Sequence, residues 1–245
     1  MSYFFKAIWI LLIIFVQLSC TKKTTTSSIR PSPTPVDTIT TPVTGSSKTY
    51  LALGDSYTIG ASVDSSQRFP VQTKEWLLSN GIKMGTPQII ATSGWTTVNL
   101  ETAISIQNPV GPYDAISLLI GVNDQYQRRD STGYRDRFAN LLRKAIQLTG
   151  NKPSHVFVLS IPDYSVTPFA RYNDMVAIRK EIDEFNLINK EVTLQHNCAY
   201  LDITTSTREA ANDPSLIAGD GLHPSGKEYK KWAERLGLLM KVVLQ

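Results

Sequence analysis

A short apolar run that ends in Gly-Asp-Ser constrains the fold of this chain more than any other feature. Positions Tyr50 to Leu53 are apolar, and the tripeptide Gly54-Asp55-Ser56 follows at once. Such a run, bounded by turn residues, is typical of a strand buried on both faces of a parallel sheet. Ser56 would then lie at the carboxyl end of a strand, the edge where open α/β sheets bind ligands. Ser56 is therefore a candidate nucleophile, although Gly-Asp-Ser is also an ordinary turn sequence.

The first 20 residues have the pattern of an export signal. Lys6 precedes an apolar stretch, Ala7 to Val16, that is too short to span a bilayer. The stretch ends in Gln17-Leu18-Ser19-Cys20, which resembles the lipobox of bacterial lipoproteins, with Gln17 in place of the usual apolar residue. This resemblance implies that Cys20 becomes the lipidated first residue of a protein exported to the cell envelope. A plain cleaved signal or an inner-membrane anchor is the alternative.

Residues 21–47 differ sharply in composition from the rest of the chain. They are almost entirely Thr, Ser and Pro, and so few apolar residues cannot offset the entropy lost on ordering. We expect a disordered tether here. The remaining segment, 48–245, is about 200 residues long, a normal size for one α/β domain with one core.

Charge and cysteine content exclude several classes of protein. The net charge is only +4, and no dense basic block or nucleic-acid motif accompanies it, so no nucleic-acid partner is expected. Cys20 and Cys198 are the only cysteines, which leaves no disulfide framework, and we expect Cys198 in the core. The sequence has no H-E-x-x-H, clustered cysteines or P-loop, so neither a metal nor a cofactor is predicted. The oligomeric state stays open.

Strand-like and helix-like patterns alternate along the predicted domain. Apolar runs predict strands at Tyr50 to Leu53, Gln88 to Ala91, Ala115 to Ile120, His155 to Ile161 and Tyr200 to Ile203. Helical spacing marks Pro70 to Asn80 and the segments around 138–146, 175–192 and 229–243. Strands that alternate with helices predict an α/β fold with a right-handed, doubly wound parallel sheet.

Polar residues follow the predicted strands at one edge of this sheet. Gly94 follows the second strand, Asn123 follows the third, and Asp220 and His223 follow the fifth, just before the last helix. The carboxyl ends of parallel strands meet at a common edge, so these residues should lie near Ser56. Each of them alone is compatible with an ordinary turn. Together they indicate a functional site.

The same segments carry a resemblance to a known family. In order, Gly54-Asp55-Ser56, Gly94, Gly121-Val122-Asn123-Asp124 and Asp220-Gly221-Leu222-His223-Pro224 resemble the blocks of the SGNH or GDSL hydrolases. The resemblance covers essentially all of 48–245. It implies a flavodoxin-like, three-layer α/β/α sandwich with a five-stranded parallel sheet, and ester hydrolysis. It also implies a triad of Ser56, Asp220 and His223, and an oxyanion hole formed by Ser56, Gly94 and Asn123. Tyr57 departs from the Leu of the family name, which bears on subfamily placement.

The chemistry of the residues is consistent with these roles. A serine hydroxyl needs a base within hydrogen-bonding reach, and histidine is the usual one. His155 falls in a predicted strand and His196 at a helix end, so His223 is the best candidate. Asp220 can fold back across Gly221 to orient the imidazole. Pro224 biases His223 away from helical geometry, and we expect the last helix to start at this proline.

The sequence therefore predicts a lipid-anchored, exported serine esterase that forms an acyl-enzyme. There is no G-x-S-x-G elbow around Ser56, which disfavours an α/β-hydrolase. Acetylated glycans, lysophospholipids, thioesters and simple short-chain esters all remain possible substrates. The alternative is a non-catalytic surface lipoprotein that binds a glycan or lipid with the same fold. Aromatic residues near the active edge could stack on sugars, line an acyl pocket or simply pack loops; they are Tyr57, Trp95, Tyr126, Tyr164 and Phe169.

Overall fold

The computed structural model of the chain describes residues 46–127 and 131–245. The predicted export signal with Cys20, and all but the last two residues of the predicted tether, lie outside these ranges. No helix within the described ranges is both long and apolar enough to cross a membrane.

Five parallel strands form the central sheet, in the order β2-β1-β3-β4-β5. Their bounds are β1 (Tyr50–Gly54), β2 (Gln88–Ala91), β3 (Ala115–Leu119), β4 (Val156–Leu159) and β5 (Ala199–Leu201). This order confirms the predicted flavodoxin-like sheet. Strand β2 lies on one side of β1, and β3 lies on the other side. The direction in which successive strands are added therefore reverses between β1 and β3. Ligands of open α/β sheets bind at such a switch point, at the carboxyl ends of the strands.

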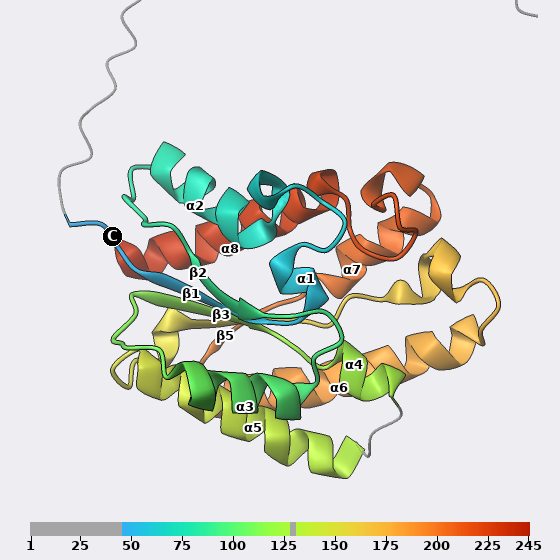
Figure 1. The fold of residues 1–245 in the computed structure, drawn as a ribbon, viewed down its shortest axis with the longest axis horizontal. Helices are drawn as coiled ribbons and strands as arrows, with labels where there is room; N and C mark the ends of the chain where they lie inside the picture. The colour runs from blue at the N-terminus through green and yellow to red at the C-terminus, as the bar shows by residue number, and fades with distance from the viewer. Residues whose placement is uncertain (1–45, 128–130) are drawn as a thin grey trace, which may run out of the picture. The chain divides into compact units, whose positions relative to one another are not determined.

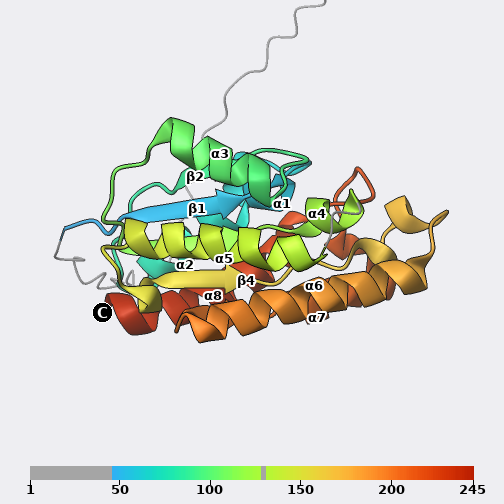
Figure 2. The same cartoon turned by 90° about the horizontal axis from the view of Figure 1, so that it is seen from below.

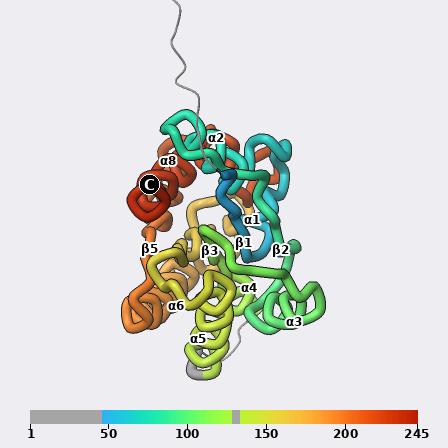
Figure 3. Tube along the Cα trace, turned by 90° about the vertical axis from the view of Figure 1, so that its left-hand side faces the viewer, coloured from blue at the N-terminus to red at the C-terminus, as the bar shows by residue number. Residues whose placement is uncertain are grey.

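Helices cover both faces of the sheet and complete the predicted three layers (Figures 1 and 2). One face carries α2 (Phe69–Ser79) and α8 (Gly226–Leu244), and the other carries α3 (Thr97–Gln107), α5 (Ser131–Leu148) and α6 (Met175–Gln195). Figure 3 shows the sheet between these two layers. Short helices are α1 (Ser56–Ile59), α4 (Val122–Tyr126) and α7 (Thr204–Thr207). Single 3-10 turns span Ser65–Gln67, Pro153–His155, Tyr164–Val166, Pro168–Ala170, Arg208–Ala211 and Pro214–Leu216.

The core lies on both faces of the three central strands. Every residue of β1, β3 and β4 is buried, whereas the edge strands β2 and β5 are partly exposed. The predicted stripe of α8 is also buried, with Tyr229, Trp232, Leu236 and Met240 turned inward. Each such large side chain stabilises the fold by about 1.5–3 kcal/mol when it is fully buried. Cys198 is buried, as expected.

The structure corrects several predicted boundaries. The fourth strand begins at Val156 and ends at Leu159, so His155 lies in the preceding 3-10 turn. The last helix begins at Gly226 and not at Pro224, because Pro224 forms an isolated antiparallel bridge with Ile217 that holds the chain extended. The sequence does not predict helix α3. Its apolar spacing is poor, since only Leu100 and Ile104 among its large apolar residues are buried.

Candidate active site

Ser56 lies on a tight turn between β1 and α1. The Asp55 side chain caps α1 by accepting a hydrogen bond from the Tyr57 backbone N–H at 3.0 Å. A Cβ atom at Gly54 would lie 2.1 Å from Thr58 Oγ1, so only glycine fits at the end of β1. The strand therefore ends abruptly and delivers Ser56 to the carboxyl edge of the sheet, as predicted.

His223 and Asp220 are in direct contact in the loop before α8. His223 Nδ1 lies 2.6 Å from Asp220 Oδ2, and an ionised carboxylate can only accept, so Nδ1 donates. This contact leaves Nε2 of the imidazole directed to its other side. Ser56 and His223 line one pocket, which brings the predicted nucleophile and base to the same place.

Asp220 accepts three further hydrogen bonds. Oδ1 accepts from the backbone N–H groups of Leu222 and His223 at 3.0 Å, and Oδ2 accepts from Ser62 Oγ at 2.7 Å. Partial burial alone would raise the pKa of the Asp220 carboxyl, but the hydrogen bonds from His223, Ser62 and the backbone outweigh it and hold the pKa well below its usual range. Asp220 therefore stays ionised. Ser62 was missed at the sequence level, because it lies 158 positions away in a turn of ordinary composition.

Asn123 stands in the first turn of α4, directly after β3. Gly121 precedes it with φ 127°, and a Cβ atom there would lie 2.2 Å from the Tyr134 hydroxyl oxygen, so the sharp entry into α4 requires glycine. Asn123 Nδ2 donates to the Trp95 carbonyl oxygen at 3.0 Å. The side-chain amide nitrogen of Asn123 carries two hydrogens, so the second one can donate a hydrogen bond to a ligand. Asn123 lines the pocket of Ser56 and His223.

Gly94 lies in the exposed turn after β2 and is not among the residues that line this pocket. Its carbonyl oxygen accepts from Gln127 Nε2 at 3.4 Å, and the neighbouring Trp95 contacts Asn123. Two hydrogen bonds thus tie the turn after β2 to α4. The assignment of the Gly94 N–H to an oxyanion hole stays a prediction.

Tyr57 packs its ring against the imidazole of His223. The two ring centroids are 5.0 Å apart and the planes are tilted by 56°. Tyr57 is buried, so it forms a fixed wall for the imidazole on the side of α1. The residue that departs from the Leu of the family name therefore contacts the proposed base directly.

Aromatic side chains surround the pocket, which has about 80 Å³ of free volume. Four of the five aromatic residues singled out in the sequence line it, and Trp95 does not. The complete lining is Ser56, Tyr57, Val122, Asn123, Tyr126, Tyr164, Phe169, Leu222 and His223.

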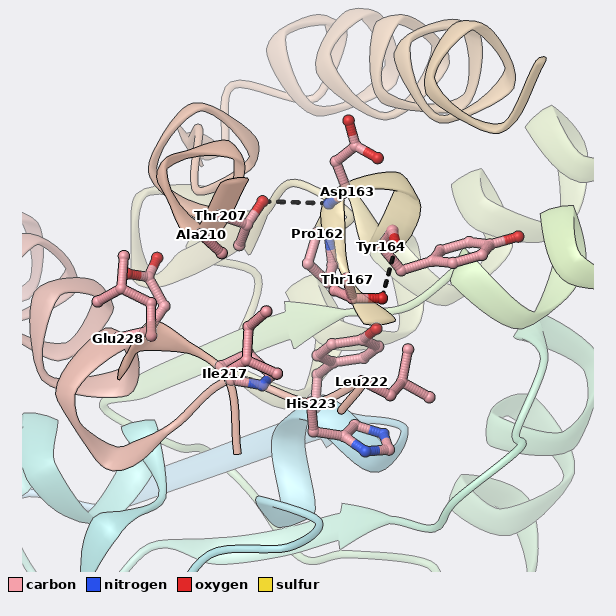
Figure 4. A pocket seen from close by; sticks show the side chains of 13 residues that line it. Pro162, Asp163, Tyr164, Thr167, Thr207, Ala210, Ile217, Leu222, His223 and Glu228 are labelled. Atoms are coloured by element: carbon pink, nitrogen blue, oxygen red, sulfur yellow. Dashed lines mark hydrogen bonds between the residues drawn. The ribbon is translucent and has the colours of Figure 1, made fainter. Parts of the chain in front are cut away.

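The loop after β4 carries two of these aromatic residues and is fixed by a buried carboxylate. Asp163 Oδ2 lies 2.8 Å from Arg208 Nε, while its Oδ1 accepts from the Ser165 N–H at 2.9 Å. The Asp163 N–H donates to Thr207 Oγ1 at 3.1 Å, as Figure 4 shows. A second cavity of about 20 Å³, also drawn there, reaches from this loop to His223. These contacts anchor the loop beside the imidazole.

The other two histidines are engaged elsewhere. His155 lies just before β4, and its Nδ1 contacts the carbonyl oxygen of Asp114. His196 lies at the end of α6, and its Nδ1 contacts the carbonyl oxygen of Val192. Within residues 46–127 and 131–245, no group of three or more His, Cys, Asp or Glu side chains could hold a metal ion.

The fold and the site define a parallel α/β protein with a serine, a histidine and a carboxylate at its switch point. The sequence matches the GDSL-like Lipase/Acylhydrolase family over residues 52–231, and the chain belongs to that family. The resemblance to SGNH or GDSL hydrolases is thereby confirmed. Membership supports an enzyme that hydrolyses ester bonds. No curated protein matches the chain by sequence.

Solved structures share the fold at low sequence identity. TesA is 18% identical with a TM-score of 0.65, and the match covers 80% of this chain and 100% of TesA. A lipase/acylhydrolase from Enterococcus faecalis is 20% identical with a TM-score of 0.58, covering 80% and 95%. The acetylxylan esterase Axe2 from Geobacillus stearothermophilus is 18% identical with a TM-score of 0.58, also covering 80% and 95%. These likenesses establish the fold.

Proposed function

We propose that this protein is a serine esterase that hydrolyses carboxylic esters through an acyl-enzyme. Ser56 is the nucleophile, His223 is the general base and Asp220 orients the imidazole. The observation that carries the proposal is the 2.6 Å contact of His223 Nδ1 with an ionised Asp220, in a loop whose histidine shares a pocket with Ser56. That arrangement is the chemical requirement for activating a serine hydroxyl.

In the proposed reaction, Ser56 Oγ attacks the carbonyl carbon of the ester while His223 Nε2 takes the hydroxyl proton. The tetrahedral oxyanion accepts hydrogen bonds from the backbone N–H groups of Ser56 and Gly94 and from the Asn123 amide. The C–O bond to the alcohol then breaks, and the imidazolium returns its proton to the leaving oxygen. Water, deprotonated by the same imidazole, attacks the acyl-enzyme and releases the acid and free Ser56.

Covalent labelling tests this proposal against a non-catalytic, ligand-binding protein of the same fold. A fluorophosphonate probe should label the wild type, and the Ser56→Ala variant should be neither labelled nor active while its melting temperature stays close to that of the wild type. Esterase activity retained by Ser56→Ala would refute the role of Ser56. An unlabelled and inactive wild type would favour the binding protein.

The acyl length of the substrate is a separate proposal. We infer that acetyl and propionyl esters are better substrates than long-chain esters such as those of lysophospholipids, because the pocket that contains Ser56 is small, with a volume of about 80 Å³. The likeness to the acetylxylan esterase Axe2 is consistent with this choice. A panel of esters graded by acyl length tests it, and a preference for octanoyl or longer chains would refute it.

We also propose that the protein is exported and held on the cell envelope by a lipid on Cys20. The apolar stretch from Ala7 to Val16 and the motif Gln17-Leu18-Ser19-Cys20 that follows it support this proposal. The Cys20→Ser variant should lose membrane retention or keep its signal uncleaved. Normal retention and processing of this variant would exclude lipidation at Cys20.

A further inference from the structure

Two pockets meet at the rings of Tyr126 and Tyr164. Both rings line the pocket that contains Ser56, and both also line a neighbouring pocket of about 130 Å³ beside the start of α6. None of the predicted catalytic residues lines the neighbouring pocket. The second space is therefore adjacent to the pocket of Ser56, with the two aromatic residues between them.

The aromatic rings are fixed and leave a surface open to a ligand. Tyr126, Tyr164 and Phe169 pack with centroids 6.0–6.2 Å apart and planes tilted by 50–75°, so none is stacked face to face on another. Tyr126 is 55% exposed and Phe169 is 42% exposed. The Tyr164 hydroxyl donates to Gln125 Oε1 at 3.0 Å, which holds its ring in place. The mutual packing of the three rings limits their freedom, and this lowers the entropic cost of binding a ligand on them.

The neighbouring pocket has polar side chains in its lining, in contrast to the aromatic rings of Tyr126, Tyr164 and Phe169. Its lining includes the amide of Asn173 and the carboxylates of Asp174 and Glu181. Asp174 Oδ1 caps α6 by accepting from the Val176 and Ala177 N–H groups, and Glu181 Oε2 accepts from Gln125 Nε2 at 2.6 Å. Each carboxylate has a second oxygen that can accept from a ligand hydroxyl. Hydroxyl-accepting groups therefore stand next to an aromatic face.

We propose that Tyr126 and the adjoining pocket of Asn173, Asp174 and Glu181 form a subsite for a neutral sugar ring in the alcohol part of the ester. A sugar ring has an apolar C–H face that suits the negative face of an aromatic ring, and hydroxyl edges that suit carboxylates and amides. This inference rests on the proposed esterase function. It specifies an O-acylated glycan as the substrate class.

Three other alcohol parts fit this arrangement less well. A fatty chain would place apolar surface against two carboxylates and an amide, and these groups would lose hydration without gaining partners. A phosphate-bearing leaving group would bring negative charge toward Asp174 and Glu181. A flat aromatic alcohol could use the Tyr126 ring but would not use the polar pocket.

The test compares three acetyl esters and one acetyl thioester, which differ in the leaving group. Acetylated xylo-oligosaccharides, ethyl acetate, 4-nitrophenyl acetate and acetyl-coenzyme A are assayed with the full-length protein. The readout is the ratio of kcat/KM for the oligosaccharide to kcat/KM for ethyl acetate. Tyr126→Ala should lower this ratio about tenfold, mainly through KM, and Asn173→Ala about threefold. Tyr126→Phe keeps the ring and should keep the ratio. Tyr172→Ala removes an exposed tyrosine that lines neither pocket, and should also leave the ratio unchanged.

The outcomes separate this inference from the proposed function. Turnover of ethyl acetate and Ser56-dependent labelling, with an unchanged ratio in Tyr126→Ala and Asn173→Ala, would overturn the sugar subsite alone. A preference of the wild type for acetyl-coenzyme A would overturn it as well. An effect of Tyr126→Ala confined to 4-nitrophenyl acetate would assign the ring to aromatic alcohols instead. A wild type that is neither labelled nor active on any ester would overturn both proposals.

Discussion

The hydroxyl of Ser62 donates to Asp220 Oδ2 at 2.7 Å, and the same oxygen accepts from His223 Nδ1 at 2.6 Å. Ser62 belongs to the turn that follows α1, so the segment just after the proposed nucleophile holds the carboxylate that orients the proposed base. The backbone of Ser62 has a positive φ of 65°, which residues other than glycine rarely adopt. This conformation directs the hydroxyl toward Asp220. Ser62 is therefore a positioning residue for the imidazole.

Removing the Ser62 hydroxyl should slow catalysis without affecting binding. We expect Ser62→Ala to lower kcat about tenfold, ~1.4 kcal/mol, since a hydrogen bond to a charged group is lost. KM for a small ester should barely change. Ser62→Gly is the matched control, because it also lacks the hydroxyl but relieves the positive φ. Equal losses in both variants would support the hydroxyl, whereas a loss confined to Ser62→Ala would point to the backbone.

Asn123 should contribute mainly to the transition state. If its amide donates to the oxyanion, Asn123→Ala should lower kcat on the order of 100- to 1000-fold, about 3 to 4 kcal/mol, as for one oxyanion-hole donor in subtilisin. KM should stay nearly constant. The variant also loses the hydrogen bond to the Trp95 carbonyl oxygen, which is worth about 1 kcal/mol of stability. Steady-state kinetics beside thermal melts tests this, and a large fall in melting temperature or a loss confined to KM would exclude the oxyanion role.

Local patterns predict much of this fold because its central strands are buried on both faces. Continuous apolar runs such as Val156–Leu159 then stand out, and the polar residues that follow the strands must meet at one edge. This pattern predicts Ser56, Asn123 and His223 as candidate site residues. It does not predict helix α3, because the exposed Val98 and Ile106 interrupt the apolar stripe of that helix.

The contacts that fix the site are long-range, and no local pattern encodes them. Ser62 meets Asp220 across 158 positions, and Tyr57 meets His223 across a similar separation. The predicted start of α8 is wrong for a different reason: the short-range bridge between Pro224 and Ile217 holds Pro224 extended, so the helix begins at Gly226. The way in which the loops pack against one another in three dimensions determines the contacts of Ser62 and Tyr57.

The ring of Tyr57 should matter more than its hydroxyl. Tyr57→Phe keeps the packing against His223, so we expect kcat within about twofold of the wild type. Tyr57→Leu introduces the residue of the family name and loses the aromatic contact, which is worth about 0.5–1.5 kcal/mol, so kcat should fall roughly two- to tenfold. Steady-state kinetics with a small acetyl ester measures both. A loss in Tyr57→Phe equal to that in Tyr57→Leu would show that the hydroxyl is the important group.

Asp55 carries a buried carboxyl beside the proposed nucleophile. Burial, helped by the nearby Asp124 carboxylate, raises its pKa to about 8 in spite of the lowering effect of the hydrogen bond from the Tyr57 backbone N–H. Its Oδ2 atom has no hydrogen-bond partner among the residues of the described fold. At neutral pH the folded protein therefore holds Asp55 mostly protonated, whereas the unfolded chain releases this proton at a pKa of about 3.9.

This difference predicts how stability depends on pH. A folded-state pKa above the unfolded one gives stability that is complete below about pH 4 and is lost as the pH rises through about 8, at up to roughly 1.4 kcal/mol per pH unit. Asp55→Asn keeps the shape and an oxygen for the Tyr57 N–H but cannot titrate. From pH 5 to pH 8, the free energy of unfolding of the wild type should therefore fall relative to that of Asp55→Asn. Other titrating groups contribute equally to both proteins and cancel in the difference. Urea unfolding at four pH values measures it, and curves that stay parallel across this range would show that Asp55 is ionised in the folded state.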